Sequence, residues 1–232
     1  MNVEELYGRY CDCGCRVTTD SRAIKGGEMF FALKGEKFDG NDYVLSSLEA
    51  GASYAVADRA DLPDDERIIK VDDAYCALRD LAVWHRTHIH GGNLPVIGLT
   101  GTNGKTTTKN LVSRVLARKY KVAATQGNFN NDIGVPLSLL GMRPDTEIAV
   151  IEMGANHPDD IAKLVKVCQP DYGLITNVGK AHLLGFGSIE GVVAAKTELY
   201  KWLGSRIGSV IFLNEDDSVL RAKAAGQPCH CF

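Results

Sequence analysis

A glycine-rich turn between an apolar run and a helix-like stretch is the strongest chemical signal in this chain. The turn reads Thr100-Gly-Thr-Asn-Gly-Lys-Thr-Thr107, and a run rich in β-branched residues precedes it at 94–100. The backbone N–H groups of such a turn and the N-terminus of the next helix attract an anion. Lys105 adds a positive charge, and the Thr106 hydroxyl can reach Mg²⁺. The pattern predicts a loop that binds the phosphates of a nucleoside triphosphate.

The spacing of this loop departs from the common phosphate-loop pattern, which would place a glycine where Leu99 stands. A short G-x-x-G-K-T string also occurs in ordinary glycine-rich turns. The strand-like run before it and the helical spacing of apolar residues after it favour the phosphate loop. Those apolar residues are Leu111, Val112, Val115 and Leu116.

Two further candidates follow predicted strands. Glu152 ends the apolar run 147–153, and a carboxylate beside a phosphate loop can bind Mg²⁺, directly or through water. The alternative is a solvated glutamate at a strand end. His182 follows the strand expected at 171–176, where an imidazole can be a metal ligand, a base or an ordinary partly buried side chain.

Lys196 is unusual because it lies on the apolar stripe of the helix expected at 189–203. A lysine in that place is either paired, extended toward solvent or modified. One possible modification is the addition of CO₂ to its amine, which would give a carbamate that ligates a metal as a carboxylate does. The asparagine-rich loop 127–136 can contact a polar substrate or simply form turns.

Alternating strands and helices position these residues. Strands are expected near 94–100, 121–125, 147–153, 171–176 and 209–213, and helices near 106–118, 158–168 and 189–203. This alternation predicts a doubly wound, mostly parallel sheet with ligands at the carboxyl ends of its strands. Before it, residues 1–90 predict a smaller mixed α/β domain with strands near 29–33, 54–57 and 67–71 and helices near 43–50 and 73–88. Turn-forming residues at 90–93 separate the domains 1–90 and 91–232.

Composition sets broad limits on function. The 232 residues carry a net charge of −3, with 45% hydrophobic and 24% charged residues, which is typical of a globular protein and gives no footprint for nucleic acid or an anionic membrane. No apolar run approaches the ~18 residues of a membrane span, and the polar N-terminus is unlike a signal peptide, so we expect a cytoplasmic protein. Seven cysteines without such a signal predict reduced thiols. The clusters Cys11-x-Cys13-x-Cys15 and Cys229-His-Cys231 lack the usual zinc spacing.

Several strings together resemble the Mur ligase family, the ATP-dependent amide-forming enzymes of peptidoglycan precursor synthesis. In chain order they are Thr19-Asp-Ser-Arg22, Phe30-Phe-Ala-Leu-Lys-Gly35 with Asp39-Gly40, Thr100–Thr107, Asn130-Asn-Asp-Ile-Gly-Val-Pro136, Glu152-Met-Gly-Ala-Asn-His157, Ala181-His-Leu-Leu-Gly-Phe-Gly-Ser188 and Lys196-Thr-Glu-Leu-Tyr200. Their order covers residues 16 to 220, and the short glycine loop is the form this family uses. One departure is Leu184, where the family usually has an acidic residue.

Within the family, the strings are most similar to those of the member that adds D-alanyl-D-alanine to UDP-N-acetylmuramoyl-tripeptide (UDP-MurNAc-tripeptide). The resemblance implies that the peptide carboxylate takes the γ-phosphate of ATP, and that the amine of D-alanyl-D-alanine then displaces phosphate. A related Mur or folylpolyglutamate-type ligase is the alternative within the same chemistry. A fragment that binds nucleotide or UDP-sugar without turnover is the alternative outside it. The family also implies a third domain beyond residue 232, so this chain alone is expected to be inactive.

The resemblance assigns roles residue by residue. It implies that ATP phosphates are held by Gly101, Thr102, Asn103, Gly104, Lys105, Thr106 and Thr107. It implies Mg²⁺ at Thr106 and Glu152, with His182 and a carbamylated Lys196 assisting a second ion. The peptide region would be lined by Asn131, Asn156 and His157. The UDP-sugar would be held by Ser21, Arg22 and Lys37. No nucleic acid, membrane insertion or obligate protein partner is implied.

Overall fold

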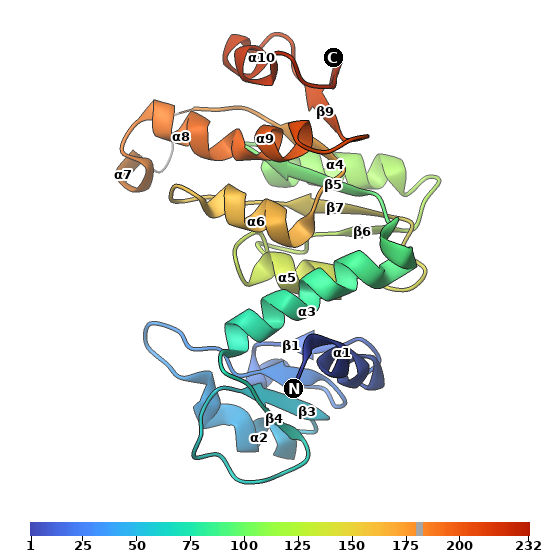
Figure 1. The fold of residues 1–232 in the computed structure, drawn as a ribbon, viewed down its shortest axis with the longest axis vertical. Coiled ribbons are helices and arrows are strands. Elements are labelled where there is room, and N and C mark those ends of the chain that lie inside the picture. The colour runs from blue at the N-terminus through green and yellow to red at the C-terminus, as the bar shows by residue number, and fades with distance from the viewer. Residues whose placement is uncertain (180–182) are drawn as a thin grey trace. The chain divides into compact units, whose positions relative to one another are not determined.

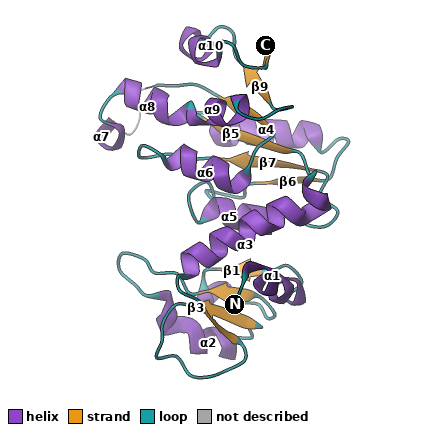
Figure 2. Cartoon of the chain, viewed as in Figure 1, coloured by secondary structure: helices purple, strands orange, loops and turns teal. Residues whose placement is uncertain are grey.

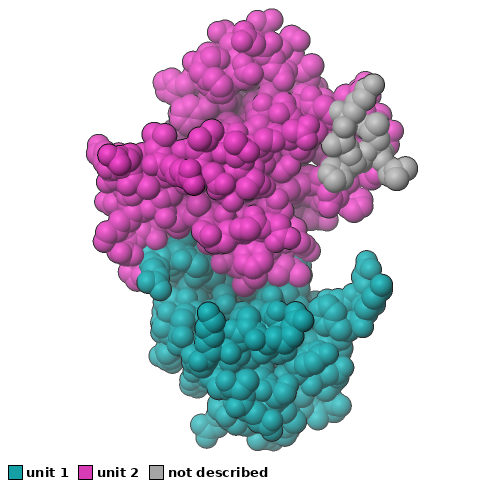
Figure 3. Space-filling model, turned by 180° about the vertical axis from the view of Figure 1, so that it is seen from behind, with its two compact units in different colours: residues 1–88, 139–143 teal, residues 89–138, 144–232 magenta. Residues whose placement is uncertain are grey.

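The computed structural model describes residues 1–179 and 183–232. Two compact units divide these residues (Figure 3). The first unit comprises 1–88 together with 139–143, and the second comprises 89–138 and 144–232. No helix in the described part of the chain is long and apolar enough to cross a membrane.

The first unit is built on a four-stranded parallel sheet of order β1-β2-β3-β4 (Figures 1 and 2). Its strands are β1 (Val17–Thr18), β2 (Met29–Phe31), β3 (Tyr54–Ala57) and β4 (Ile68–Lys70), and its helices are α1 (Val3–Asp12), α2 (Val44–Glu49) and α3 (Ala74–His88). Short 3₁₀ turns span Ser21–Ala23 and Gly40–Tyr43, and a third spans Ile89–Gly92 at the start of the second unit. The side chains of Phe30, Val44 and Leu48 pack together between the sheet and α2. The predicted strands and helices of this region are confirmed, whereas α1 and β1 were not predicted.

Helix α1 forms because its first turn is capped. The Asn2 side chain accepts from the backbone N–H of Glu5, and the Glu5 carboxylate accepts from the backbone N–H of Asn2. This reciprocal pair satisfies N–H groups that a helix N-terminus otherwise leaves without partners.

A buried polar network joins α1, α3 and the segment 139–143 within the first unit. The Tyr10 hydroxyl donates to the carbonyl of Leu140 at 2.6 Å. The ring of His85 lies 3.1 Å from both the Tyr7 hydroxyl (through Nδ1) and the Met142 carbonyl (through Nε2). A carbonyl only accepts, so Nε2 carries the proton and Nδ1 accepts from Tyr7. Burial lowers the pKa of His85, although the hydrogen bond to Met142 acts in the opposite direction.

The second unit is a six-stranded parallel sheet of order β10-β9-β8-β5-β7-β6. The strands are β5 (Val96–Thr100), β6 (Val122–Ala124), β7 (Ile148–Glu152), β8 (Tyr172–Ile175), β9 (Val210–Leu213) and β10 (Cys229–Cys231). The helices are α4 (Lys105–Leu116), α5 (Gly134–Leu140, which runs into the first unit), α6 (Asp160–Cys168), α7 (Leu183–Phe186), α8 (Ile189–Lys196), α9 (Glu198–Gly204) and α10 (Ser218–Ala224). The predicted doubly wound parallel sheet is confirmed. The C-terminal cysteine cluster forms the edge strand β10, which was not predicted.

Alternation along β5 separates the two faces of this sheet. Leu99 packs with Val112 and Leu116 of α4. The preceding residue, Gly98, lies on the opposite face and pairs in register with Gly173 of β8. A Cβ added at Gly173 would lie 2.7 Å from the Leu203 side chain of α9. Helix α4 therefore covers one face and α9 the other, and glycine lets α9 approach closely (Figure 1).

Two local expectations were wrong. The helix expected at 189–203 is interrupted at Thr197, where ψ opens to −1° and α8 gives way to α9. The Thr197 hydroxyl donates to the carbonyls of Val193 and Ala194, a contact that bends helices. The loop expected over 127–136 ends earlier, since α5 already begins at Gly134.

Candidate active site

The predicted phosphate loop leaves the centre of the sheet between two neighbouring strands. It follows β5, which lies between β7 and β8. The backbone takes positive φ at Gly101 (152°) and Gly104 (77°), and α4 begins directly afterwards at Lys105. A Cβ at Gly101 would lie 1.9 Å from the Thr176 hydroxyl oxygen, so this position requires glycine. The loop and the α4 N-terminus together present N–H groups at the carboxyl edge of the sheet.

The end of β8 holds the loop in this conformation. The Thr102 N–H donates to the Asn177 carbonyl at 2.9 Å, and the Asn103 N–H donates to the Asn177 side-chain oxygen at 3.0 Å. The Thr176 hydroxyl donates to the Asn103 carbonyl at 2.6 Å. Three hydrogen bonds to the end of β8 therefore hold the loop before any ligand binds. Asn177 was not singled out from the sequence, although its place after a predicted strand was a signal.

Lys105 folds back over its own loop. Its ammonium group donates to the carbonyls of Gly101 (2.9 Å) and Thr102 (3.1 Å). These contacts place a positive charge beside the glycine turn, where an anion would meet it.

Glu152, at the end of β7, is the centre of a buried network. Only 1% of its surface is exposed. The Thr106 hydroxyl lies 3.1 and 3.3 Å from its two carboxylate oxygens, and the Asn130 amide donates to one of them at 2.8 Å. The ammonium group of Lys109 lies 3.8 Å from the other oxygen. The predicted pair Thr106 and Glu152 is thus in contact, and Asn130 and Lys109 are partners that the sequence analysis did not assign.

These donors suit a hard divalent cation. A carboxylate and a hydroxyl are hard oxygen ligands of the kind that Mg²⁺ accepts, and phosphate oxygens would complete its shell. No group of three or more His, Cys, Asp or Glu side chains that could hold a metal occurs among residues 1–179 and 183–232. A cation here would therefore depend on Thr106, Glu152 and the ligand's own oxygens.

Lys196 is buried at the end of α8, with 2% of its surface exposed. Burial, and then the nearby charge of Lys105, lower its pKa to about 8. Within the described residues its ammonium group has no hydrogen-bond or ion-pair partner. The predicted position on an apolar stripe is observed, and Lys105 is near enough for its charge to act on the pKa of Lys196. His182 lies outside the described residues.

The predicted peptide-binding residues follow β6 and β7. The Asn131 side chain accepts from the Gly134 N–H at 2.8 Å and so supports the first turn of α5. The backbone N–H groups of Asn156 and His157 both donate to the Asp160 carboxylate at 2.9 Å. All three side chains are exposed, in contrast to the buried Glu152.

The predicted UDP-sugar residues lie in the first unit, after its first two strands. Ser21 and Arg22 follow β1, and Lys37 follows β2, so they share the carboxyl edge of that parallel sheet. The Arg22 guanidinium is exposed and pairs with Asp20 at 2.9 Å. Lys37 is exposed. No hydrogen bond joins these three side chains.

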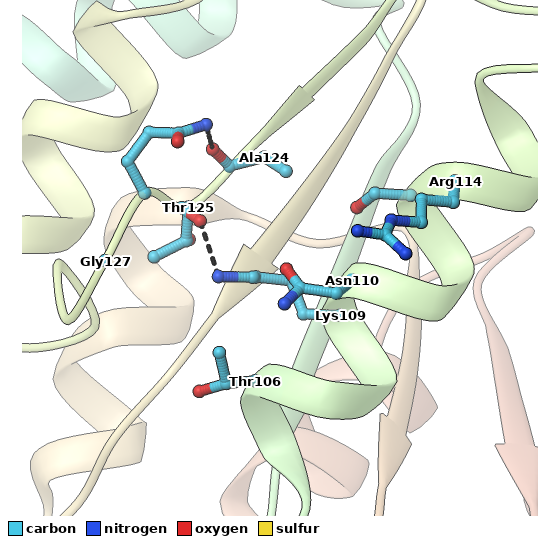
Figure 4. A pocket seen from close by; sticks show the side chains of 9 residues that line it. Thr106, Lys109, Asn110, Arg114, Ala124, Thr125 and Gly127 are labelled. Carbon is cyan, nitrogen blue, oxygen red and sulfur yellow. Dashed lines mark hydrogen bonds between the residues drawn. The ribbon is translucent and has the colours of Figure 1, made fainter.

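A polar pocket of about 400 Å³ opens between α4 and the end of β6 (Figure 4). It is lined by Thr106, Lys109, Asn110, Ser113, Arg114, Ala124, Thr125, Gln126 and Gly127. Thr106 and Lys109, two partners of Glu152, thus form part of its wall, whereas Glu152 does not line it.

A doubly wound sheet with a glycine loop at its central crevice defines the class of phosphate-loop α/β proteins. Comparison with known families is more specific. The Mur ligase middle domain matches residues 99–232, and the Mur ligase family catalytic domain matches residues 16–86. The chain belongs to the Mur ligase family.

Individual relatives point to one branch of that family. The chain is 41% identical over 202 residues to UDP-N-acetylmuramoyl-tripeptide–D-alanyl-D-alanine ligase of Bacillus subtilis, a match that covers 86% of this chain and 43% of the relative. The Escherichia coli protein of the same name is 38% identical, with 87% and 43% covered. The crystal structure of MurF ligase from Thermotoga maritima in complex with ADP is 34% identical with a TM-score of 0.83, covering 94% of this chain and 50% of that one. The chain therefore spans less than half the length of the curated relatives it matches.

Proposed function

We propose that this chain belongs to an ATP-dependent ligase that joins D-alanyl-D-alanine to UDP-MurNAc-tripeptide in peptidoglycan precursor synthesis in the cytoplasm. The contact between the Thr106 hydroxyl and the buried Glu152 carboxylate, at the mouth of a preformed phosphate loop, carries this proposal. The named relatives at 38–41% identity support the choice of substrates. A diaminopimelate-adding Mur ligase structure is only 18% identical and supports the fold alone.

The residues of the second unit divide the work of phosphoryl transfer, which consists mainly of positioning and charge neutralisation. The N–H groups of the loop 101–104 and the first turn of α4 would bind the phosphates of ATP, and Lys105 would turn from its own carbonyls toward them. Thr106 and Glu152 would hold Mg²⁺, which neutralises the phosphate charge when bound. The substrate carboxylate would then take the γ-phosphoryl group, and the amine of D-alanyl-D-alanine would displace phosphate from the acyl phosphate.

Lys196 is proposed to act as a carbamate. Its neutral amine would add to CO₂ with loss of one proton, which converts a buried, unpaired cation into an anion facing Lys105. That conversion removes the cost of a buried unpartnered charge. With His182, the carbamate would assist a second cation. Asn131, Asn156 and His157 would line the peptide region, and Ser21, Arg22 and Lys37 of the first unit would hold the UDP-sugar.

The test is ADP release with ATP, Mg²⁺, UDP-MurNAc-tripeptide and D-alanyl-D-alanine, each omitted in turn. Release that needs all four supports the ligase. Binding of ADP and of UDP-MurNAc-tripeptide without release would assign the chain only the binding part of the reaction. Absence of binding to either ligand by calorimetry would contradict the proposal.

A further inference from the structure

Lys109 is a buried lysine that the reaction outlined above does not use. It lies on α4 one turn beyond Lys105, and only 4% of its surface is exposed. Its ammonium group donates to the Thr125 carbonyl at 2.7 Å and lies 3.8 Å from a carboxylate oxygen of Glu152. Figure 4 shows the side chain reaching from α4 to Thr125, with Thr106 on the preceding turn of the same helix.

Lys109 supplies the charge that a buried carboxylate needs. Isolation of a carboxylate from water costs several kcal/mol unless a partner compensates it. Across the described ranges 1–179 and 183–232, Lys109 is the one cationic side chain within ion-pair distance of Glu152. Thr106 and Asn130, the other partners, are neutral.

Lys109 makes its hydrogen bond and its ion pair with two different residues. The short hydrogen bond of Lys109 goes to Thr125, at the end of β6, and fixes the ammonium group there. The Thr125 hydroxyl in turn accepts from the Glu152 N–H at 3.0 Å, so the same residue anchors both partners. Because Lys109 stands 3.8 Å from the carboxylate, it compensates the charge without occupying a lone pair. Those lone pairs stay available to Thr106, Asn130 and a cation.

We propose that Lys109 is a positioning residue that holds the Glu152 carboxylate toward the Thr106 hydroxyl for a divalent cation, without itself contacting substrate. This inference rests on the proposed function, because it assumes a cation bound with nucleotide at Thr106 and Glu152. Lys109 and Thr125 also line the pocket in Figure 4, whereas the buried Glu152 does not.

The test measures Mn²⁺ binding to the ADP-loaded chain by electron paramagnetic resonance, and ADP binding in EDTA by calorimetry. We expect Lys109→Met to weaken Mn²⁺ binding about 10–100-fold, the usual effect of removing a group that orients a metal ligand. Metal-free ADP affinity should change less than about twofold, because the loop contacts 101–104 remain. Lys109→Arg, which keeps the charge, should recover most of the affinity. Lys119→Met, which removes an exposed lysine beyond α4, is the matched control.

Three results would overturn the inference: unchanged Mn²⁺ binding, tighter Mn²⁺ binding as simple charge repulsion would give, or an equal loss of Mn²⁺ and metal-free ADP binding. If Lys109→Met does not fold, the Mn²⁺ affinities of Glu152→Gln and of the double variant Lys109→Met/Glu152→Gln test the inference instead. The double variant is suitable because it leaves neither buried charge without its partner. Equal Mn²⁺ affinity of these two variants supports action through Glu152, and a further loss in the double variant contradicts it. Failure of the wild-type chain to bind Mn²⁺ with ADP would contradict the proposed function itself.

Discussion

The two sheets place their predicted binding residues at the same kind of edge but hold them very differently. In the second unit, Thr106 and Glu152 come from different elements, and hydrogen bonds between residues 46 apart in sequence join them. In the first unit, Arg22 pairs with Asp20, two residues away, and stays exposed. The buried polar network of that unit lies instead around His85. The residues proposed to take part in phosphoryl transfer are thus held in place in advance, whereas those proposed to bind the UDP-sugar have no such fixed partners.

The largest expected effect is the loss of turnover when Lys196 is replaced. In the complete enzyme we expect Lys196→Ala to lower turnover by about 10³-fold or more, the upper range for loss of one preorganised charged group, with no rescue by bicarbonate. A carbamate carbon signal after addition of ¹³C-bicarbonate should appear in the wild-type chain and vanish in the variant. Lys201→Ala, an exposed neighbour on α9, is the control. Near-normal turnover or an unchanged carbon signal in Lys196→Ala would refute the carbamate.

Next in size is the loss of charge in the phosphate loop. Lys105→Ala should weaken ADP binding about 10–100-fold, since a hydrogen bond to a charged group contributes roughly 1.5–3 kcal/mol. Calorimetry measures the change, with Lys119→Ala as control. Equal affinities of the Lys105→Ala and wild-type chains would remove Lys105 from the site.

The fixed geometry of the loop can be probed with two glycines. Gly101→Ala should lower the free energy of unfolding by about 1–3 kcal/mol, because the new methyl group would overlap Thr176. Gly104→Ala meets no atom within 4 Å and should cost only the ~1 kcal/mol of a positive φ. Urea unfolding compares them, and the reverse order would show that the loop is not held as described.

A smaller effect concerns His85. Its pKa is lowered in the folded chain, so the unfolded chain binds the extra proton first as the pH falls through its ordinary value near 6.5. The contribution of neutral His85 is fully present above that value and declines below it, by at most about 1.4 kcal/mol per pH unit. Thermal unfolding between pH 7.5 and 5 measures it. A His85→Gln variant should lose this part of the slope, and an unchanged slope would contradict the assignment.

The smallest effect is expected at Arg22. Arg22→Ala should leave the unfolding midpoint unchanged, because its ion pair is exposed and screened. Affinity for UDP-MurNAc-tripeptide should fall only about threefold at physiological salt, for the same reason. A large loss of stability would show that the first unit relies on this edge for its fold.

The sequence predicted those parts of the molecule that local pattern determines. The strand–loop–helix around Lys105 and the strand ending at Glu152 were readable because apolar runs and glycine spacing are local signals. The interruption at Thr197 was not, since the apolar period continues through it and the local opening of the backbone leaves no mark in the sequence. Strand β10 contains no β-branched residue, so its sequence did not predict a strand. It is defined by its parallel pairing with β9.

The same reasoning explains why some residues around Glu152 were not predicted from the sequence. A lysine one turn beyond Lys105 is indistinguishable in sequence from a solvated lysine, and Lys109 is buried through tertiary contacts with Thr125 and Glu152. Asn130 and Asn131 are adjacent and chemically equal. Asn130 contacts Glu152 while Asn131 supports a helix, and this division depends on which way the chain turns at the end of the loop.

The segment 139–143 has a practical consequence for dissecting this protein. It belongs to the first unit, although it is separated from residue 88 by fifty residues of the second. A fragment that ends at residue 88 would leave the Tyr10 hydroxyl and His85 Nε2 without their carbonyl acceptors on Leu140 and Met142. Expression of residues 1–88 alone should therefore yield a poorly folded product, and a synthetic peptide spanning 139–143 is the natural reagent with which to attempt complementation.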